Sequence, residues 1–508
     1  MIEAGTFKGK TIAVFGLGRS GITAALSLQK GGADVLAWDD NEASQKSAKD
    51  QGVRVKDLTK ADWDKIDELM LSPGVPHELP KAHWSAEKAK NAGVPIICDI
   101  EIFAREVMAR APERRPNIIA ITGTNGKSTT TALIGHILAE AGRDSQVGGN
   151  IGRGVLDLED IYGGANYVLE LSSYQLERTY SLKANAAIFL NLTPDHLDRH
   201  GDMKAYEQAK LRIFANQTKD DTAIIGVDGP QGKRICSRLK AQNGRRVLPI
   251  SGKRSLGRGV CVIKGKLYSM MDGRCELVVD LRDAAGLDGE HNWQNAAAAY
   301  GAVRALGLKP KTIGKAILSF PGLAHRLENI GHAGPVKYVN DSKATNVDAV
   351  AQALKTYDNI YWIAGGQAKQ NMAKQNMAKQ DMAKEGALDA LAPHFGNITR
   401  AYLIGEAADD FERSLKAKKV TAKVSTELRL AIMCATKDAL ASRAPNPVVL
   451  LSPACASFDQ FKDFEARGDE FRKLSLEIIG VFEREKANID PSTSPSTSPS
   501  ATGKENVA

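Results

Sequence analysis

Short apolar runs that end in glycine or in polar turn residues recur along the whole chain. They are TIAVFGLG, DVLAWDD, LMLSPGV, IIAITGTN, YVLELSS, AAIFLNL, VKYVNDS, IYWIAGG, AYLIGE and VVLLSPA. Helix-like segments separate most of these runs, and this alternation predicts an α/β fold with largely parallel sheets. In such sheets ligands bind at the carboxyl ends of the strands. Nearly every unusual polar cluster of this chain directly follows one of the runs.

Two breaks in the pattern, at residues 109–117 and 319–328, suggest domain boundaries. At roughly 150 residues per domain, a chain of 508 residues has room for about three domains. The predicted domains are residues 1–108, 109–322 and 323–486.

Two segments depart from this organisation. Residues 487–508 are rich in Ser, Thr and Pro without an apolar period, so we expect disorder there. The three tandem units NMAKQ, NMAKQ and DMAKE occupy residues 371–385. Five residues turn about 500° in a helix, so the three methionines would spiral around the axis. We interpret the repeat as an exposed insertion without chemistry of its own.

Composition narrows the class of protein. The chain is 43% hydrophobic and 25% charged, and its net charge of +8 is mild. No apolar run reaches the roughly 18 residues of a membrane helix, and nothing near the start resembles a signal peptide. The six cysteines include no C-x-x-C pair, which argues against a zinc site or a disulfide framework and fits a reducing cytoplasm.

The stretch AITGTNGKSTTTAL, residues 120–133, predicts a strand, a glycine turn and a helix. Backbone N–H groups and the positive helix end converge at such a turn. Lys127 and Ser128 add an ammonium and a possible magnesium ligand, as in phosphate-binding loops. The usual spacing would put glycine at position 121, where Ile121 stands. We expect a phosphate-binding loop with a shorter turn, and a capped glycine turn is the alternative.

Carboxylate, imidazole and amine side chains follow the next runs. Glu170 lies toward the end of YVLELSS, where a carboxylate needs a cation, hydrogen bonds or a structural salt bridge. His196 and His200 are four residues apart, so a zinc pair is conceivable if this segment is helical. The helix-like AYEQAKLRIF puts Lys210 on its apolar side. The alternative to a functional role is a snorkelling lysine, whose stem packs on apolar surface while its ammonium reaches water.

The first run, VFGLGRSG, also fits a dinucleotide-binding fingerprint. Asp39 ends the second strand about 20 residues later, where the acid that binds an NAD ribose would sit. From this segment alone, an NAD-dependent oxidoreductase is a serious alternative.

TGTNGKSTT and the A-K-L-R-I-F pattern resemble the Mur ligase superfamily, which includes folylpolyglutamate synthetases. The resemblance covers almost the whole chain. It implies three α/β domains: a Rossmann-like UDP-binding domain, a central P-loop-type ATPase domain and a Rossmann-like C-terminal domain. It also implies that ATP cleavage drives amide formation through an acyl phosphate.

Further stretches narrow the resemblance within the superfamily: VFGLGRSG, LSPGV, GGNIG, NDSKATN and LLSPACASFDQFKDFEARG. They resemble the branch that adds D-glutamate to UDP-N-acetylmuramoyl-L-alanine in peptidoglycan synthesis. The implied protein is a cytoplasmic monomer that binds no nucleic acid and does not insert into a membrane. A different ligase of the superfamily and a non-catalytic nucleotide-binding scaffold compete with this interpretation.

The resemblance also nominates site residues. The implied catalytic residues are Lys127, Glu170, His196 and Lys210. The implied ligands of two magnesium ions are Ser128, Glu170, His196 and Lys210, the last carbamylated by CO2 to give an anionic oxygen ligand. The implied ATP contacts are Gly123, Thr124, Asn125, Gly126, Lys127, Ser128, Thr129, Asn292, Arg326 and Asp341. The implied contacts to the UDP substrate are Arg19, Ser20, Asp39, Ser72, Gly74 and Asn150.

For D-glutamate the resemblance nominates Lys343, Thr345, Lys369, Ser457 and Phe464. A cation and hydroxyl donors suit a dicarboxylate. Phe464 has a core alternative, because Phe461, Phe464 and Phe471 have helical spacing. The lysine is ambiguous, because the repeat places four candidates after alanine: Lys369, Lys374, Lys379 and Lys384. Gln367 stands where the family often has an acid.

Overall fold

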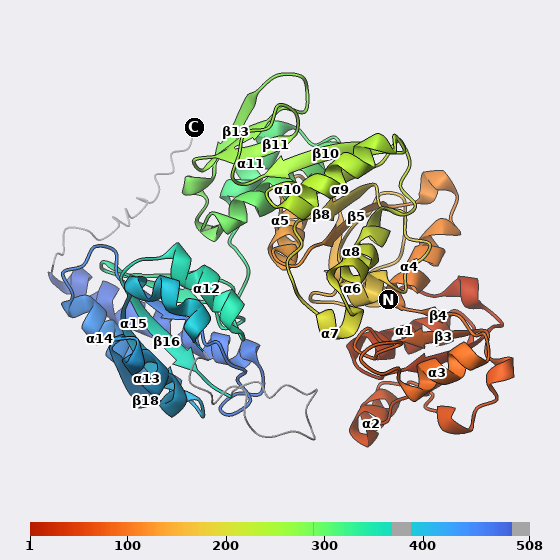
Figure 1. Cartoon of the computed structure of the whole chain (residues 1–508), viewed down its shortest axis with the longest axis horizontal. Coiled ribbons are helices and arrows are strands. Elements are labelled where there is room, and N and C mark those ends of the chain that lie inside the picture. The colour runs from red at the N-terminus through yellow and green to blue at the C-terminus, as the bar shows by residue number, and fades with distance from the viewer. Residues whose placement is uncertain (288, 368–387, 490–508) are drawn as a thin grey trace, which may run out of the picture. The chain divides into compact units, whose positions relative to one another are not determined.

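The protein is described by a computed structural model that covers residues 1–287, 289–367 and 388–489. The described residues form an α/β fold with three sheets, as the sequence predicts. They divide into two compact units, each with its own core, and the boundary lies between Gly322 and Leu323 (Figure 1). The MAKQ repeat and Lys369 lie outside the described residues.

The first sheet has four parallel strands in the order β2-β1-β3-β4. Its strands are β1 (Thr11–Phe15), β2 (Asp34–Trp38), β3 (Glu68–Leu71) and β4 (Ile96–Ile97). Its helices are α1 (Arg19–Lys30), α2 (Glu42–Asp50), α3 (Trp84–Asn91) and α4 (Asp99–Met108). The order brings the loops after β1, β2 and β3 to one edge of the sheet, which is where parallel sheets bind ligands.

The second sheet has nine strands in the order β13-β12-β11-β10-β9-β8-β5-β7-β6, and β12 pairs antiparallel with both of its neighbours. Its strands are β5 (Asn117–Thr122), β6 (Ser145–Gly149), β7 (Asn166–Glu170), β8 (Ala186–Phe189), β9 (Thr222–Gly226), β10 (Arg246–Ser251), β11 (Val260–Ile263), β12 (Lys266–Ser269) and β13 (Glu276–Asp280). Its helices are α5 (Lys127–Glu140), α6 (Ser173–Leu176), α7 (Leu197–His200), α8 (Met203–Leu211), α9 (Pro230–Ala241), α10 (His291–Ala305) and α11 (Pro310–Leu318). The phosphate-type loop follows β5, which lies inside this sheet between β7 and β8.

The two faces of the second sheet bury different cores. Ile119 and Ile121 of β5 face α5, α10 and α11, whereas Ile118 and Ala120 face the opposite side. This period of two is that of a strand buried on both faces. The core on the Ile118 side continues into the first sheet and includes α1 and α4. The continuous core explains why both sheets belong to one compact unit.

The third sheet forms the second unit, with strands in the order β14-β15-β19-β16-β17-β18. Its strands are β14 (Glu328–Ala333), β15 (Val336–Asn340), β16 (Ile360–Gly365), β17 (Ile398–Ile404), β18 (Ala422–Thr426) and β19 (Val448–Leu451). Its helices are α12 (Val347–Thr356), α13 (Ala408–Ala417), α14 (Leu428–Ala441) and α15 (Phe464–Ile489). The edge strand β14 is antiparallel to its neighbour, and the pairs formed by β15 to β19 are parallel.

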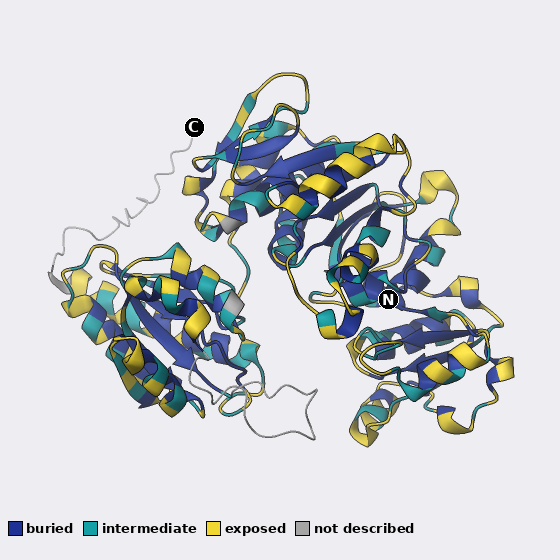
Figure 2. Ribbon diagram, viewed as in Figure 1, coloured by how far each residue is buried: buried dark blue, intermediate teal, exposed yellow. Residues whose placement is uncertain are grey.

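Helices cover both faces of the third sheet, with α12 and α13 on one side and α14 and α15 on the other. Strands are buried while the outer helix faces are exposed (Figure 2). None of the helices in the described part of the chain combines the length and the apolarity that a membrane span needs.

Local capping fixes the start of α8, which carries Lys210, and of α6, which follows Glu170. The Asp202 carboxylate accepts a hydrogen bond from the Ala205 N–H (2.8 Å) and so starts α8, which presents Lys210. Ser172 and Gln175 form a reciprocal capping box at the start of α6, directly after β7. These caps define where each helix begins relative to the neighbouring strand end.

Candidate active site

The turn between β5 and α5 contains only residues 123–126. Gly123 and Gly126 have φ angles of 152° and 86°. The positive φ angle of Gly126 favours glycine, and a Cβ there would lie 2.2 Å from the Asn295 Oδ1, so the Asn295 side chain would have to shift. Ile121 belongs to the buried strand β5 and pairs with Glu170 of β7. The prediction of a shorter turn is confirmed, because the position of the missing glycine is inside the strand.

Asn191, which follows β8, braces this turn from the side. Its Oδ1 accepts from the Asn125 N–H (2.9 Å), and its Nδ2 donates to the Asn125 carbonyl (3.1 Å) and to the Gln294 Oε1 (3.3 Å). The Thr124 hydroxyl donates to the Thr193 carbonyl (3.2 Å). Asn191 was not among the predicted site residues, because an asparagine after a strand carries no distinctive signal in a single sequence.

The two lysines of the predicted site meet at one carbonyl. The Lys127 ammonium donates to the carbonyl oxygens of Gly123 (3.0 Å) and Thr124 (2.8 Å). The Lys210 Nζ donates to the same Gly123 carbonyl (2.9 Å) from the opposite helix. Ser128, in the first turn of α5, is buried beside them. The 123–126 turn and α8 are therefore joined directly through side chains.

Lys210 is fully buried, with 1% of its surface exposed. Its Nζ lies 3.4 Å from the Thr122 Oγ1 and 4.7 Å from the centre of the Tyr206 ring. Burial lowers the pKa of this lysine to about 7, and the positive charge of Lys127 contributes in the same direction. The snorkelling interpretation is wrong, because the amine points into the protein.

Glu170 is the last residue of β7 and is 3% exposed. Its Oε1 accepts a hydrogen bond from the Asn150 Nδ2 (2.9 Å). Its Oε2 is buried without a hydrogen-bond partner in the described part of the chain, and neither oxygen makes an ion pair there. The salt-bridge interpretation is therefore wrong for the described residues. A buried carboxylate oxygen without a partner fits a cation ligand.

The two histidines have different surroundings. His196 has a left-handed backbone (φ 53°), is exposed beside the Tyr174 ring, and has its Nε2 3.3 Å from the Asp195 Oδ2. His200 is buried, with its Nε2 2.9 Å from the Ser173 Oγ. Burial lowers the pKa of both imidazoles. No group of three His, Cys, Asp or Glu side chains that could hold a metal occurs among the described residues.

The glycine loop after β1 is held by side chains that follow the neighbouring strands, one as acceptor and one as donor. Asp39 accepts hydrogen bonds from the N–H groups of Leu17 (2.6 Å) and Asn41 (2.8 Å). The Ser72 hydroxyl donates to the Gly16 carbonyl (2.6 Å). A Cβ at position 21 would lie 1.8 Å from the Gly16 carbonyl oxygen. Arg19, Ser20 and Gly74 lie on the same edge of the sheet, with Arg19 and Gly74 exposed.

Arg178 was not predicted, yet it fixes the second loop of that edge. It is buried, and its guanidinium donates to the carbonyl oxygens of Leu71 (2.9 Å), Ser72 (3.3 Å) and Pro73 (3.0 Å). The loop of the first sheet is thereby tied to α6, which follows Glu170. An arginine after LSSYQLE is indistinguishable from a surface arginine in the sequence.

In the second unit, Asp341 follows β15 and is buried. Its carboxylate accepts from the Ser452 hydroxyl (2.8 Å) and from the Leu327 N–H (3.2 Å). Burial raises the pKa of Asp341 to about 7, although the nearby charge of Arg326 opposes the shift.

Asn292 of the first unit accepts a hydrogen bond from the Nδ2 of Asn295 (3.0 Å), and Asn295 lies next to Gly126. The predicted ATP contacts are thus divided between the two units.

The predicted D-glutamate contacts of the described residues lie in the second unit, with Lys343, Thr345 and Ser457 on loops and Phe464 at the first position of α15. The Lys343 Nζ lies 5.5 Å from the centre of the half-buried Phe464 ring. Phe471, by contrast, is fully buried in the core. The core interpretation therefore fits Phe471 and not Phe464. Ser457 is buried, and the Thr345 N–H donates to the Lys343 carbonyl (2.8 Å).

Arg467 of α15 connects these loops and was not predicted. It is 1% exposed, and burial lowers its pKa to about 10. Its guanidinium donates to the Ser342 Oγ (3.0 Å) and to the carbonyl oxygens of Ser342 (2.9 Å), Cys455 (3.1 Å) and Ala456 (3.2 Å). The loops that carry Lys343 and Ser457 therefore share one clamp.

Family models match most of the chain. Residues 121–303 match the Mur ligase middle domain, and residues 325–455 match the glutamate ligase domain of Mur ligases. Residues 6–98 match the NADPH-binding domain of acetohydroxy acid isomeroreductase. This last match covers only the first sheet and explains why VFGLGRSG also fits a dinucleotide fingerprint.

The relatives of the whole chain decide the family. The UDP-N-acetylmuramoylalanine–D-glutamate ligase of Caulobacter sp. (strain K31) is 53% identical over 472 residues, which is 93% of this chain and 97% of the relative. The ligases of the same name from Phenylobacterium zucineum and Paramagnetospirillum magneticum are 51% and 46% identical over 93% of this chain and 97% and 98% of their own. This chain belongs to the family of UDP-N-acetylmuramoylalanine–D-glutamate ligases.

Membership in the UDP-N-acetylmuramoylalanine–D-glutamate ligases confirms the predicted branch of the superfamily, and Mur ligases use ATP. The folylpolyglutamate synthetase and the oxidoreductase interpretations are therefore wrong. Among solved structures, UDP-N-acetylmuramate-alanine ligase MurC from Thermotoga maritima is 18% identical, with a TM-score of 0.54 over 92% of this chain and 99% of that one. MurF from Acinetobacter baumannii has a TM-score of 0.51 at 18% identity over 75% and 79%. Both likenesses concern the fold.

Proposed function

We propose that the side chains around the 123–126 turn carry out the ligation of this family. That reaction adds D-glutamate to UDP-N-acetylmuramoyl-L-alanine in peptidoglycan synthesis. The observation that carries the proposal is that two buried side chains, Lys210 and Glu170, lie beside the turn. One is a buried amine on the Gly123 carbonyl, and the other is a buried carboxylate with an oxygen that no described residue satisfies.

The fit to magnesium rests on the oxygen donors of the first unit. The unpartnered Oε2 of Glu170 is a hard oxygen ligand of the kind that magnesium prefers. Ser128, Glu170, His196 and carbamylated Lys210 would hold the two ions. When bound, magnesium offsets negative charge on the phosphoryl group that is transferred.

Carbamylation of Lys210 requires a neutral amine. The nitrogen lone pair forms a bond to the carbon of CO2, one N–H proton leaves to solvent, and an anionic carbamate remains. A pKa of about 7 leaves a large part of Lys210 neutral near pH 7. The modification also replaces a buried ammonium, which cannot ligate a metal, by two oxygen donors.

The chain's own residues would act in sequence on the substrates. The substrate carboxylate attacks the γ-phosphorus of ATP, the bond from that phosphorus to the β–γ bridging oxygen breaks, and ADP leaves. The Lys127 ammonium stabilises charge on the phosphoryl oxygens during this transfer. The resulting acyl phosphate is attacked by the amine of D-glutamate. The C–N bond forms, the C–O bond to phosphate breaks, and inorganic phosphate leaves. The nitrogen that was the amine of D-glutamate loses a proton in the same step.

The nucleotide and substrate contacts are proposed with these roles. Gly123, Thr124, Asn125, Gly126, Lys127, Ser128, Thr129, Asn292, Arg326 and Asp341 would bind ATP. Arg19, Ser20, Asp39, Ser72, Gly74 and Asn150 would bind the UDP substrate. Lys343, Thr345, Ser457 and Phe464 would bind D-glutamate, with Lys369 as a further candidate outside the described residues.

The same proposal includes three statements about the whole protein. Its domains are residues 1–108, 109–322 and 323–486, it is located in the cytoplasm, and it is a monomer.

The test is phosphate release from ATP with UDP-N-acetylmuramoyl-L-alanine and a panel of amino acids. We expect release only with D-glutamate, together with the amide product. Release with another amino acid would keep the phosphate chemistry and overturn the acceptor. Release that persists in a Glu170→Gln variant at the wild-type rate would remove this site from the mechanism.

A further inference from the structure

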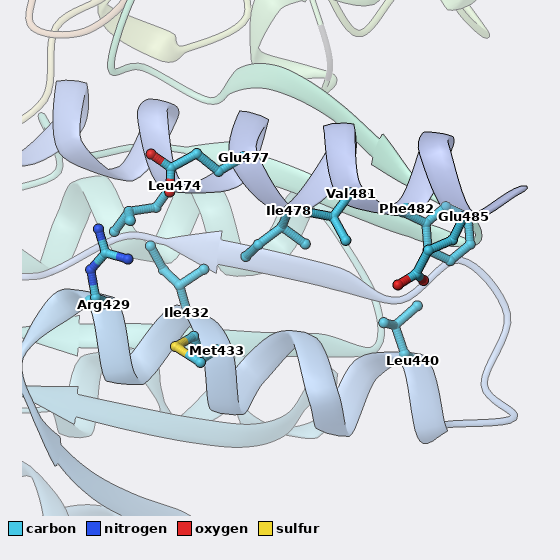
Figure 3. Close-up of a pocket in the computed structure, with 10 residues that line it drawn as sticks. All are labelled: Arg429, Ile432, Met433, Leu440, Leu474, Glu477, Ile478, Val481, Phe482 and Glu485. Atoms are coloured by element: carbon cyan, nitrogen blue, oxygen red, sulfur yellow. The ribbon is translucent and has the colours of Figure 1, made fainter. Parts of the chain in front are cut away.

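A groove of about 360 Å³ runs between α14 and α15 on the second unit (Figure 3). Its apolar lining is Ile432, Met433, Leu440, Ile478, Val481 and Phe482. These side chains project from both helices into the space between them. None of the described residues proposed for ATP, UDP-substrate or D-glutamate binding lines the groove.

The apolar lining is unusually open to solvent. Met433 is 58% exposed, Val481 47% and Leu440 40%. Single exposed apolar side chains are normal on a soluble protein, but three along one groove form a continuous apolar surface. Such a surface is typical of an interaction site.

The rim of the groove is charged in an uneven way. Glu477 and Glu485 line the α15 side, both are exposed, and neither makes an ion pair with the rest of the described chain. Eight residues correspond to about 12 Å along a helix, or roughly two turns. On the α14 side, Arg429 stands at one end, with its guanidinium 3.9 Å from Glu470. The net character of the rim is acidic.

We propose that this groove binds an amphipathic helix of a protein partner. The partner helix carries an apolar stripe and, on one flank, two basic side chains about two turns apart. The stripe fills the space between α14 and α15, and the basic residues pair with Glu477 and Glu485, which is the helix-in-groove mode of recognition. The inference does not depend on the proposed ligation.

Other occupants fit the rim less well. A second copy of this chain would bring the acidic side of α15 against the same acidic side. An anionic lipid surface would be repelled by Glu477 and Glu485. The segment 490–508 is too poor in apolar residues to supply a stripe.

The test uses a synthetic 18-residue helix labelled with fluorescein, in which leucines form one stripe and two lysines lie eight residues apart. Its binding to the full chain is followed by fluorescence anisotropy. We expect saturable binding that weakens about tenfold or more in Met433→Glu, because a charge then lies on the apolar floor. Leu476→Glu is the matched control, because Leu476 is 51% exposed on the same α15 but does not line the groove.

A charge exchange tests the rim. In Glu477→Lys combined with Glu485→Lys, we expect the lysine peptide to bind about tenfold more weakly and a glutamate version of the peptide to bind better than the lysine one. Ligase activity should be unchanged in all variants. Absence of saturable binding, equal loss in Leu476→Glu, or no reversal of peptide preference would overturn the proposal. So would self-association of the full chain in sedimentation that Met433→Glu abolishes, or binding to phosphatidylglycerol vesicles that it abolishes.

Discussion

Two buried cations, Lys210 in the first unit and Arg467 in the second, have the same kind of surroundings but different consequences. Both are 1% exposed, and both donate to backbone carbonyl oxygens, with no carboxylate partner among the described residues. Burial lowers the pKa of Lys210 to about 7, and that of Arg467 to only about 10. Lysine can therefore give up its proton near neutral pH and become a nucleophile, whereas arginine stays charged.

The oxygen atoms near the two cations also differ in whether they receive hydrogen bonds. Around Arg467, the oxygens of Ser342, Cys455 and Ala456 all receive hydrogen bonds. Near Lys210, the Glu170 Oε2 receives none from the described residues. The buried charge of Arg467 thus fixes the shape of loops, whereas the Glu170 Oε2 has no hydrogen-bond donor among the described residues, as our proposal of a bound cation requires. We therefore expect Arg467 to position loops and Lys210 to take part in the chemistry.

The largest effect should come from Lys210→Ala. We expect phosphate release to fall by about a thousandfold, because removal of a group that acts on the transition state has effects on that scale. Short carboxylates added to the variant should restore part of the activity, since they can replace the carbamate oxygens. Phosphate release and thermal unfolding are measured together.

Two companion variants make this test specific. Lys210→Arg should be equally inactive, because a guanidinium cannot form the carbamate. Lys204→Ala, at an exposed position of the same α8, should keep wild-type activity. Full activity in Lys210→Ala would show that this buried amine is a scaffold like Arg467.

Arg467→Met should have the next largest effect. Three loop carbonyls lose a charged donor, so we expect the free energy of unfolding to fall by roughly 3 kcal/mol. The KM for D-glutamate should rise about tenfold while the KM for ATP changes little, because the clamp holds the loops of Lys343 and Ser457. Initial rates with each substrate varied in turn give this split.

The control is Lys473→Ala, at an exposed position of the same α15. Arg467→Lys should recover part of the stability, since an ammonium can reach fewer of the acceptors. Equal changes in the KM values for ATP and D-glutamate would contradict a clamp that acts on the D-glutamate loops.

The sequence predicts the elements better than it predicts these clamps. The turn at 123–126 contains two glycines with positive φ angles, which other residues rarely adopt, so the pattern identifies it. Lys210 is recognisable only through family resemblance, because its helix would equally carry a surface lysine. Arg178 and Arg467 hold loops that are distant in sequence, and an arginine that donates to carbonyls has no fixed spacing from its acceptors.

Asp341 can be compared with the two buried cations, because it is a buried acidic group whose protonation changes near neutral pH. Its pKa is raised to about 7, so ionisation is more unfavourable in the folded state than in the unfolded one. Its contribution to stability is fully present below about pH 4 and is lost as the pH rises through 7. The cost is about 1.4 kcal/mol for each unit by which the pKa is raised. Arg326 is the charged group that opposes the shift.

The measurement is the thermal midpoint of the full chain between pH 4.5 and 8.5. We expect Asp341→Asn to gain stability relative to the wild type as the pH rises, and Asp358→Asn, at an exposed position, to follow the wild type. A constant difference between Asp341→Asn and the wild type at all pH values would contradict a buried carboxyl that titrates near 7.

The smallest effect is expected for Asn150→Ala, which tests how Glu170 is held. Loss of the 2.9 Å hydrogen bond leaves the second carboxylate oxygen without its donor as well. Residues that orient metal ligands change metal affinity by roughly 10–100-fold when mutated, so we expect the lower end of that range. Calorimetric titration of magnesium into the protein with a non-hydrolysable ATP analogue would measure the change. If Asn150 acts mainly on the UDP substrate, the KM for that substrate rises and magnesium affinity does not change, which would assign it to the substrate side of the site.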